Sequence, residues 1–152
     1  MMTVRTRLFA LLMTLLVINS VTGCQRTYDY SFAQSIENIE KVEICEYDYY
    51  SHSTTLIAVL DTEDADSLLS EIDALACKRH FGDHTSTYGE VVVYITYTDG
   101  TGEVIGLRNV AQVDEDGQWH IGIEYFDAAE ICALIMKYVD VNSLPDLSKY
   151  FD

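Results

Sequence analysis

Several stretches of the chain alternate between apolar and polar residues with the period of two that is typical of β-strands. Residues 39–50 read IEKVEICEYDYY, and the short turn at 51–53 leads into a second such stretch at 54–60. Residues 91–98, VVVYITYT, are rich in β-branched and aromatic side chains and are largely apolar on both faces in their first half. We expect this third stretch to be a central strand, because a strand that is covered on both sides is apolar on both.

Glycine-containing turns separate the later strands. The segment TDGTGE contains Gly100 and Gly102, which can both adopt the positive φ angles that tight hairpins require. It predicts a hairpin from the central strand into a partner strand at 103–107. A second hairpin is expected between 110–113 and 118–125, around the turn DEDG.

Two stretches show the 3.6-residue period of amphipathic helices. Asp61 and Asp127 precede them at positions that suit an N-cap, and acidic residues follow in both first turns. We expect the first helix to end near 77–79 and the second near Val139. The apolar positions that form the buried faces are Ala65, Leu68, Leu69, Ile72, Leu75 and Ala76 in the first helix, and Ile131, Leu134, Ile135 and Tyr138 in the second.

The order of these elements predicts an α+β fold. Strands that are joined by short turns pair antiparallel, and two amphipathic helices need a sheet face to cover. We therefore expect a two-layer sandwich, with an antiparallel sheet of about five or six strands and two helices on one face. A single domain is expected at 37–140, followed by a C-terminal tail at 141–152 that contains Pro145 and packs loosely.

The N-terminus has the parts of a secretory signal. Arg5 and Arg7 provide positive charge, and the apolar run at 8–18 is too short to span a bilayer as a helix, which takes about 20 residues. The tetrapeptide VTGC at 21–24 then resembles the lipobox of bacterial lipoproteins, in which an aliphatic residue, a small residue and Gly or Ala precede a Cys. The resemblance covers the first 24 residues and does not extend to the domain behind them.

This resemblance implies that the chain is cut before Cys24 and that the Cys24 thiol carries a diacylglyceryl group. Residues 1–23 are then a cleaved signal peptide, and residues 24–36 are a short polar and aromatic tether. The protein is expected at the cell membrane, anchored by lipid and facing the extracytoplasmic side. An uncleaved N-terminal anchor is the alternative that the apolar run leaves open.

The charge of the chain excludes one class of partner. The net charge is −16, and removal of residues 1–23 leaves seven basic against 25 acidic residues, a net charge of −18. Such a chain repels nucleic acid, because binding to phosphates needs Lys and Arg. It repels anionic headgroups for the same reason and favours cationic peptides or metal ions.

Three cysteines remain besides Cys24. The simplest interpretation is that Cys45, Cys77 and Cys132 are small buried hydrophobic residues. A disulfide between Cys45 and Cys77 stays open, because an exported protein can oxidise a pair. A reactive Cys77 is a further alternative, since Lys78 and its basic neighbours can lower a thiol pKa.

The densest group of titratable residues lies in the loop HFGDHTSTYG at 80–89. His80, Asp83 and His84 offer the nitrogen and oxygen ligands that Zn²⁺ prefers, and His52 or His120 can complete the set. This loop is the basis of an alternative function, a metal-binding or enzymatic envelope protein. The opposing interpretation is a polar surface loop whose histidines are solvated.

The 11 tyrosines are the other notable feature. Tyr47, Tyr49 and Tyr50 alternate with acidic residues near the end of the first strand, and Tyr is enriched on recognition surfaces. Such a surface suits a protein, a cationic peptide or a sugar, although strands also favour Tyr for packing. Because no catalytic motif is present, we expect a non-catalytic binding or accessory domain without a cofactor.

Overall fold

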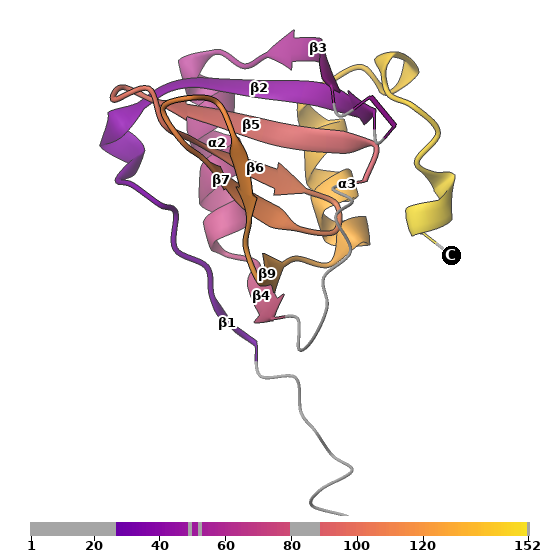
Figure 1. Ribbon diagram of the computed structural model, residues 1–152. Helices are drawn as coiled ribbons and strands as arrows, with labels where there is room; N and C mark the ends of the chain where they lie inside the picture. Colours follow the sequence, from indigo (N-terminus) through magenta and orange to yellow (C-terminus); the bar gives the residue numbers. More distant parts are fainter. Residues whose placement is uncertain (1–26, 49, 52, 80–88, 152) are drawn as a thin grey trace, which may run out of the picture.

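Six antiparallel strands form the main sheet of the computed structural model, in the order β3-β2-β5-β6-β7-β8 (Figure 1). The structure describes residues 27–48, 50–51, 53–79 and 89–151. The central strand β5 is buried along nearly its whole length, as its sequence predicts. The strands are β2 (Ile39–Asp48), β3 (Ser53–Val59), β5 (Val91–Tyr97), β6 (Gly102–Gly106), β7 (Val110–Val113) and β8 (Trp119–Ile121).

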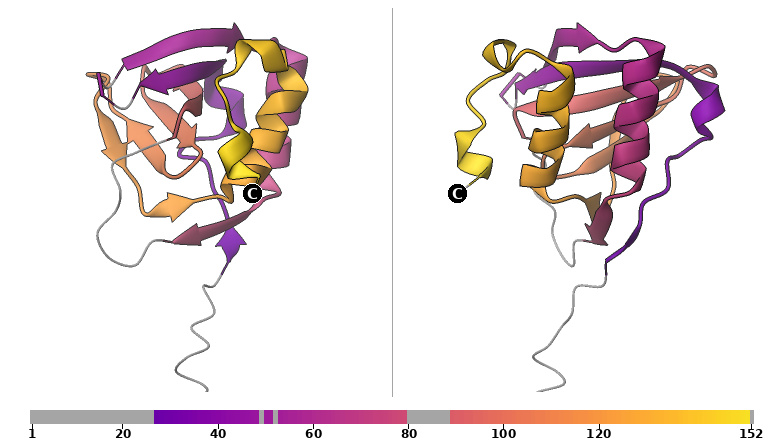
Figure 2. Two further views of the ribbon diagram at one scale, coloured as in Figure 1. Left: turned by 90° about the vertical axis from the view of Figure 1, so that its right-hand side faces the viewer. Right: turned by 180° about the vertical axis from the view of Figure 1, so that it is seen from behind.

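Helices α2 (Thr62–Asp73) and α3 (Ala128–Tyr138) lie side by side on one face of this sheet (Figure 2). Both begin where the sequence predicts, because the Asp61 carboxylate accepts the amide of Asp64 and the Asp127 carboxylate accepts the amide of Ala129. These caps satisfy backbone donors that the first turn of a helix leaves open. The expected α+β sandwich is therefore confirmed.

The main core lies between the helices and the sheet. Leu68 and Ile72 of α2 and Ile131 and Ile135 of α3 are almost completely buried, each at most 1% exposed. They belong to one continuous cluster with the sheet residues Val42, Ile44, Val93, Ile95 and Ile105. The two helices are also joined at the surface, where Tyr138 donates its hydroxyl to Glu71 at 2.6 Å.

A small second sheet, in the order β1-β4-β9, lies at one end of the molecule (Figure 1). Its strands are β1 (Tyr28–Asp29), β4 (Ala76–Arg79) and β9 (Glu124–Tyr125). The expectation that the first helix continues to 77–79 is therefore wrong, because α2 ends at Asp73. The segment ACKR has no strand pattern of its own, and it is extended because partners on both sides satisfy its backbone groups.

The N-terminal segment differs from the expected tether at 24–36. From β1 onward it is packed against the domain, and Tyr30 is only 7% exposed. The Tyr30 ring meets Phe32 and Phe126 edge-on, with ring centroids 5.5 and 5.0 Å apart. In the sequence, a polar segment with scattered aromatic residues resembles a linker. The structure shows that these aromatic residues belong to the core, because they pack against the rest of the domain.

The C-terminal tail is also packed more tightly than expected. It contains two short 3-10 turns, η2 (Val141–Ser143) and η3 (Ser148–Tyr150). Leu147 is buried in the main core, and the Tyr150 hydroxyl donates to the Glu90 carboxylate. The tail is held because these side chains find partners on the rest of the fold.

The main sheet is strongly curled. Trp119 in the edge strand β8 stacks on Tyr47 in β2, with centroids 5.5 Å apart, although three strands separate β8 from β2 in the sheet order. The curl encloses a second, smaller core on the face away from the helices. Its buried residues are Cys45, Tyr47, Val92, Val104, Ala111 and Val113.

Turn geometry agrees with the sequence at two of three glycines. Gly100 and Gly117 have φ angles of 87° and 77°, as their hairpins require. Gly102 instead begins strand β6, and a Cβ at this position would lie 2.7 Å from the carbonyl oxygen of Ile95. Close approach of the β5 backbone therefore explains this glycine.

We predict different costs for the same substitution at two leucines. Leu68→Ala should lower the free energy of unfolding by about 2–5 kcal/mol, because it leaves a cavity in the main core. Leu56→Ala should cost less than about 1 kcal/mol, because this side chain is 53% exposed. Urea titration followed by circular dichroism measures both, and equal losses would contradict the location of the core.

Candidate functional site

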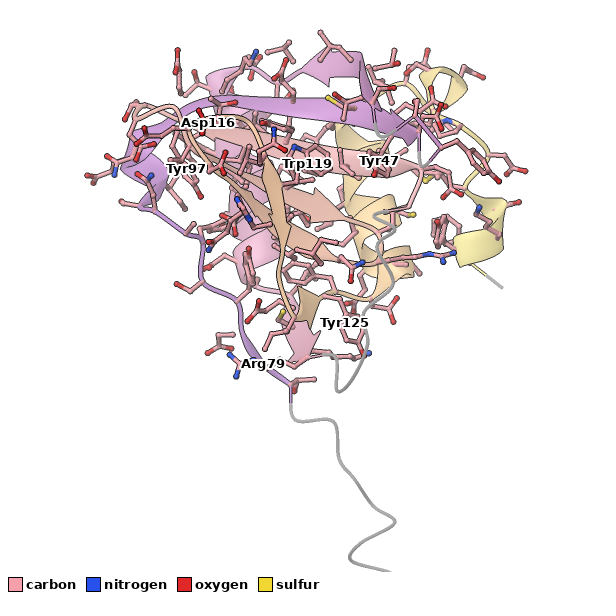
Figure 3. All side chains as sticks on the ribbon, in the orientation of Figure 1. Tyr47, Arg79, Tyr97, Asp116, Trp119 and Tyr125 are labelled. Carbon is pink, nitrogen blue, oxygen red and sulfur yellow. The ribbon has the colours of Figure 1, made fainter. Side chains whose placement is uncertain are left out.

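The curled sheet leaves a groove on the face away from the helices, which we call the aromatic groove. It has a volume of about 640 Å³ and lies between the edge strand β3 and the Trp119 side chain of β8. Figure 3 labels Tyr47 and Trp119 on this part of the sheet. The groove is lined by Glu43, Cys45, Ser53, Thr54, Leu56, Tyr94 and Trp119.

The aromatic rings of Tyr94 and Trp119 line the aromatic groove, and Tyr47 supports Trp119 from below. The Trp119 ring lies 24° from parallel to Tyr47, and its centroid is 5.9 Å from that of Tyr94. Tyr47 is buried beneath it, whereas Tyr94 and Trp119 remain partly exposed. The indole is therefore held in place by its neighbours and still has surface for a ligand.

The charge in the aromatic groove is carried by Glu43. Its carboxylate is 3.0 Å from the Lys41 ammonium, and its side chain is 17% exposed. Burial, followed by the negative charge of Glu43, raises the pKa of Tyr94 and raises that of Cys45 to about 11. Both groups therefore stay protonated near pH 7.

The tyrosines that the sequence indicated are only partly brought together. The expectation of an exposed Tyr47 is wrong, because this side chain is 6% exposed and packs under Trp119. Tyr50 is 92% exposed at the β2–β3 turn, and Tyr49 lies outside the described residues. Sequence reasoning missed Trp119 as a site residue, because its proximity to β2 depends on the curl of the sheet.

A second cavity, which we call the Glu103 cleft, lies beside the small sheet. It has a volume of about 500 Å³, and Asp29, Arg79 and Glu124 line its wall. Arg79 and Glu124 form an ion pair of 3.6 Å, and Figure 3 labels Arg79 at this end of the molecule. The Glu103 side chain reaches the cleft from β6 and is 2% exposed.

The Glu103 carboxylate is surrounded by donors. Tyr30 donates its hydroxyl to one oxygen, while the Tyr97 hydroxyl and the Ala33 amide donate to the other at 2.7 and 3.0 Å. Burial raises the pKa of Glu103 to about 7, against the opposing effect of the Ala33 amide. With both oxygens occupied, Glu103 fastens the N-terminal segment to the sheet.

Sequence reasoning also missed Glu103. A glutamate that follows a turn normally belongs to a solvated strand end, and nothing in TDGTGE distinguishes it. Two of its three donors come from Tyr30 and Ala33, which lie in the segment that the sequence predicts to be a tether. Their approach to β6 is visible only in the folded chain.

The proposed metal ligands His80, Asp83 and His84 lie outside the described residues, as does His52. His120 is described, and its Nε2 atom lies 2.7 Å from the carboxylate of Asp114 at the exposed β7–β8 turn. Within the described part of the chain, no three His, Cys, Asp or Glu side chains are grouped as a metal would need. The metal hypothesis for the loop at 80–89 stays a prediction.

The three cysteines are buried thiols, which agrees with the simplest interpretation. Cys45 belongs to the core under the aromatic groove, whereas Cys77 and Cys132 belong to the main core. The considered disulfide between Cys45 and Cys77 is not formed, because the two side chains lie on opposite faces of the main sheet. The alternative of a reactive Cys77 meets a steric obstacle, since this residue is completely buried.

Cys24 lies outside the described residues, so its acylation stays a prediction. Among the residues that the structure describes, no helix has the length and apolar character needed to cross a membrane.

Glu103 makes the stability of the domain depend on pH. The pKa of Glu103 is about 7 in the folded state, above the ordinary glutamate value of 4.5. Between these two pH values the folded state keeps a proton on Glu103 that the unfolded state has released. The free energy of unfolding therefore has its full value below about pH 4. It falls as the pH rises through 7, by about 3 kcal/mol in total.

We therefore predict that Glu103→Gln flattens the profile of unfolding free energy between pH 5 and 8. Urea titrations across this range measure the slope, with Glu40→Gln at an exposed position as the matched control. If the free energy of unfolding falls equally from pH 5 to 8 in the Glu103→Gln variant and in the unmodified protein, Glu103 is not the source of the pH dependence.

Comparison with known proteins gives no family for this chain. No family model, no curated protein and no solved structure matches it.

Proposed function

We propose that this protein is a lipid-anchored, extracytoplasmic binding protein of a bacterial membrane, attached through a diacylglyceryl group on Cys24. The support for the anchor is the charged, apolar and VTGC segments of residues 5–24. Attachment through two acyl chains is durable, because each buried methylene contributes about 0.8 kcal/mol. The folded domain begins four residues after Cys24, at β1.

The domain binds its ligand in the aromatic groove, and the ligand is a basic side chain on an extended cationic peptide. The observation that supports this is the juxtaposition of partly exposed Trp119 and Tyr94 rings with the Glu43 carboxylate. A Lys or Arg side chain over such rings gains a cation–π interaction, and the carboxylate adds an ionic one. The acidity of the whole chain attracts such a peptide over longer distances.

The edge strand β3 supports a peptide in the extended conformation. It forms one end of the main sheet and contains only uncharged residues, STTLIAV, without proline. An edge of this kind offers backbone donors and acceptors to an added strand. Thr54 and Leu56 line the aromatic groove from β3, so a peptide on this edge would direct alternate side chains into it.

Binding without catalysis fits the groups that line the aromatic groove. The Cys45 thiol and the Tyr94 hydroxyl both have raised pKa values, so neither is ready to transfer a proton or attack a substrate near neutral pH. The alternative function, in which His80, Asp83 and His84 bind a metal, stays a prediction, because those residues lie outside the described part of the chain.

The anchor predicts a specific mass. When the full chain is expressed in a bacterial host and its membrane fraction is digested, the N-terminal peptide should start at Cys24 and carry the mass of a diacylglyceryl group. Cys24→Ser should abolish both the cleavage and the modification, because the thiol is the acceptor. An unmodified peptide that retains residues 1–23 in the unaltered protein would contradict the anchor.

The aromatic groove predicts a fluorescence change on peptide binding. Trp119 is the only tryptophan, so its emission should shift when the heptapeptide KTKVKTK is added and remain unchanged with ETEVETE. Glu43→Gln should weaken binding by roughly three- to tenfold, about 1 kcal/mol, because it removes the ionic partner. Glu46→Gln, at an exposed β2 position outside the groove lining, should leave the affinity within about twofold.

A neutral oligosaccharide such as chitotriose is the comparison ligand. If it shifts the Trp119 emission and the basic heptapeptide does not, the aromatic groove binds sugar and the peptide proposal is wrong. Equal binding of both heptapeptides would also contradict it, because charge would then make no contribution.

A further inference from the structure

The distance between the expected anchor and the folded domain is short. Cys24 precedes Tyr28, the first residue of β1, by four residues. A fully extended chain spans at most about 3.6 Å per residue, so these four residues reach about 14 Å. An anchored domain is then restricted to the immediate neighbourhood of the bilayer.

The segment after Tyr28 adds no length to the free tether, because it is bound to the domain along its length. β1 pairs with β4, Tyr30 is buried in the main core, and Glu103 accepts the Tyr30 hydroxyl and the Ala33 amide. Gln34 continues the attachment, donating its side-chain amide to Thr101 at 2.9 Å. The length of the free tether is therefore fixed by the folded structure.

This attachment lies at one end of the molecule. In all three views of Figures 1 and 2, β1 and β4 lie at the lower end, whereas β2 and β3 lie at the upper end. β9 pairs with β4 and completes the small sheet at the lower end. We call the region formed by β1, β4 and β9 the anchor end.

The charges at the anchor end are more balanced than those of the whole chain. Of the seven Lys and Arg residues after Gly23, two, Lys78 and Arg79, lie in β4. They offset Asp29 and Glu124 in the neighbouring strands. An anionic headgroup layer repels an acidic surface, so the balanced charge of the anchor end lowers the cost of bringing it to the bilayer.

We propose that the anchor end docks on the headgroup layer of the bilayer and that the edge strand β3, with the aromatic groove beside it, is held at the end away from the membrane. This inference rests on the lipid anchor of the proposed function. It adds an orientation: the small sheet is the membrane-facing surface, and a peptide reaches the groove from the extracytoplasmic space.

Site-specific nitroxide labels test the orientation. The acylated full chain is placed in phosphatidylethanolamine–phosphatidylglycerol vesicles that contain a lipid with a nickel-chelating headgroup. Labels are attached at Arg79→Cys and Asp29→Cys on the anchor end, and at Thr55→Cys in β3 as the matched control. The native cysteines are buried, and the raised pKa values of Cys45 and Cys132 further limit their labelling.

Relaxation by the headgroup nickel should be several times stronger at positions 29 and 79 than at 55. A ten-residue Gly-Ser insertion between Arg26 and Thr27 should reduce this difference, because a flexible linker of that length has a mean span of about 17 Å. Equal relaxation at all three positions, in protein whose mass shows acylation, overturns the docking and leaves the anchor intact. A mass without the acyl group overturns the anchor itself, and the docking with it.

Discussion

The buried carboxylate of Glu103 is the constraint on which the arrangement of this molecule depends. A glutamate that is 2% exposed is costly unless its oxygens are hydrogen-bonded, and here Tyr30, Tyr97 and Ala33 supply the donors. Two of these donors lie in the N-terminal segment, so burial of the carboxylate and docking of that segment support each other. The position of β1, the wall of the Glu103 cleft and the short proposed tether all follow from this interaction.

The curl of the main sheet is the second determinant, and it acts on the opposite face of that sheet. It brings β8 over β2, so that Trp119 stacks on Tyr47 and a small second core closes beneath them. A flat sheet would leave that face solvated and would separate the aromatic rings by the width of the strands between them. The aromatic groove therefore exists because the sheet is curved. The Glu43 carboxylate makes it negative, like the chain as a whole.

The small sheet and the edge strand β3 give the molecule two functionally different ends. One end holds the N-terminal segment and carries Lys78 and Arg79, and the other holds the uncharged edge of β3. In the proposed function, the first end is fixed at the membrane and the second meets a cationic peptide. The electrostatics are consistent with this division, because an acidic domain is repelled by anionic headgroups and attracts basic ligands.

The local pattern of the sequence was enough for the layers of the fold. Alternation identified β2, β3 and β5, the helical period identified the buried faces of α2 and α3, and Asp61 and Asp127 marked where both helices begin. These signals are readable because each depends on neighbours within a few residues. The tail at 141–152 and the strand β4 were misjudged, since their structure depends on distant partners such as Glu90 and Asp29.

Taken by itself, the sequence determined the α+β class, the strong acidity and the resemblance of its first 24 residues to a lipoprotein signal. Only the tertiary structure decided that Tyr47 is a buried support, that Trp119 and Tyr94 form the aromatic groove, and that Glu103 is a buried fastening. The physical reason is the range of the interactions. Periodicity and capping act over one or two turns, whereas the Tyr30–Glu103 contact joins residues 73 positions apart and exists only once the chain has folded.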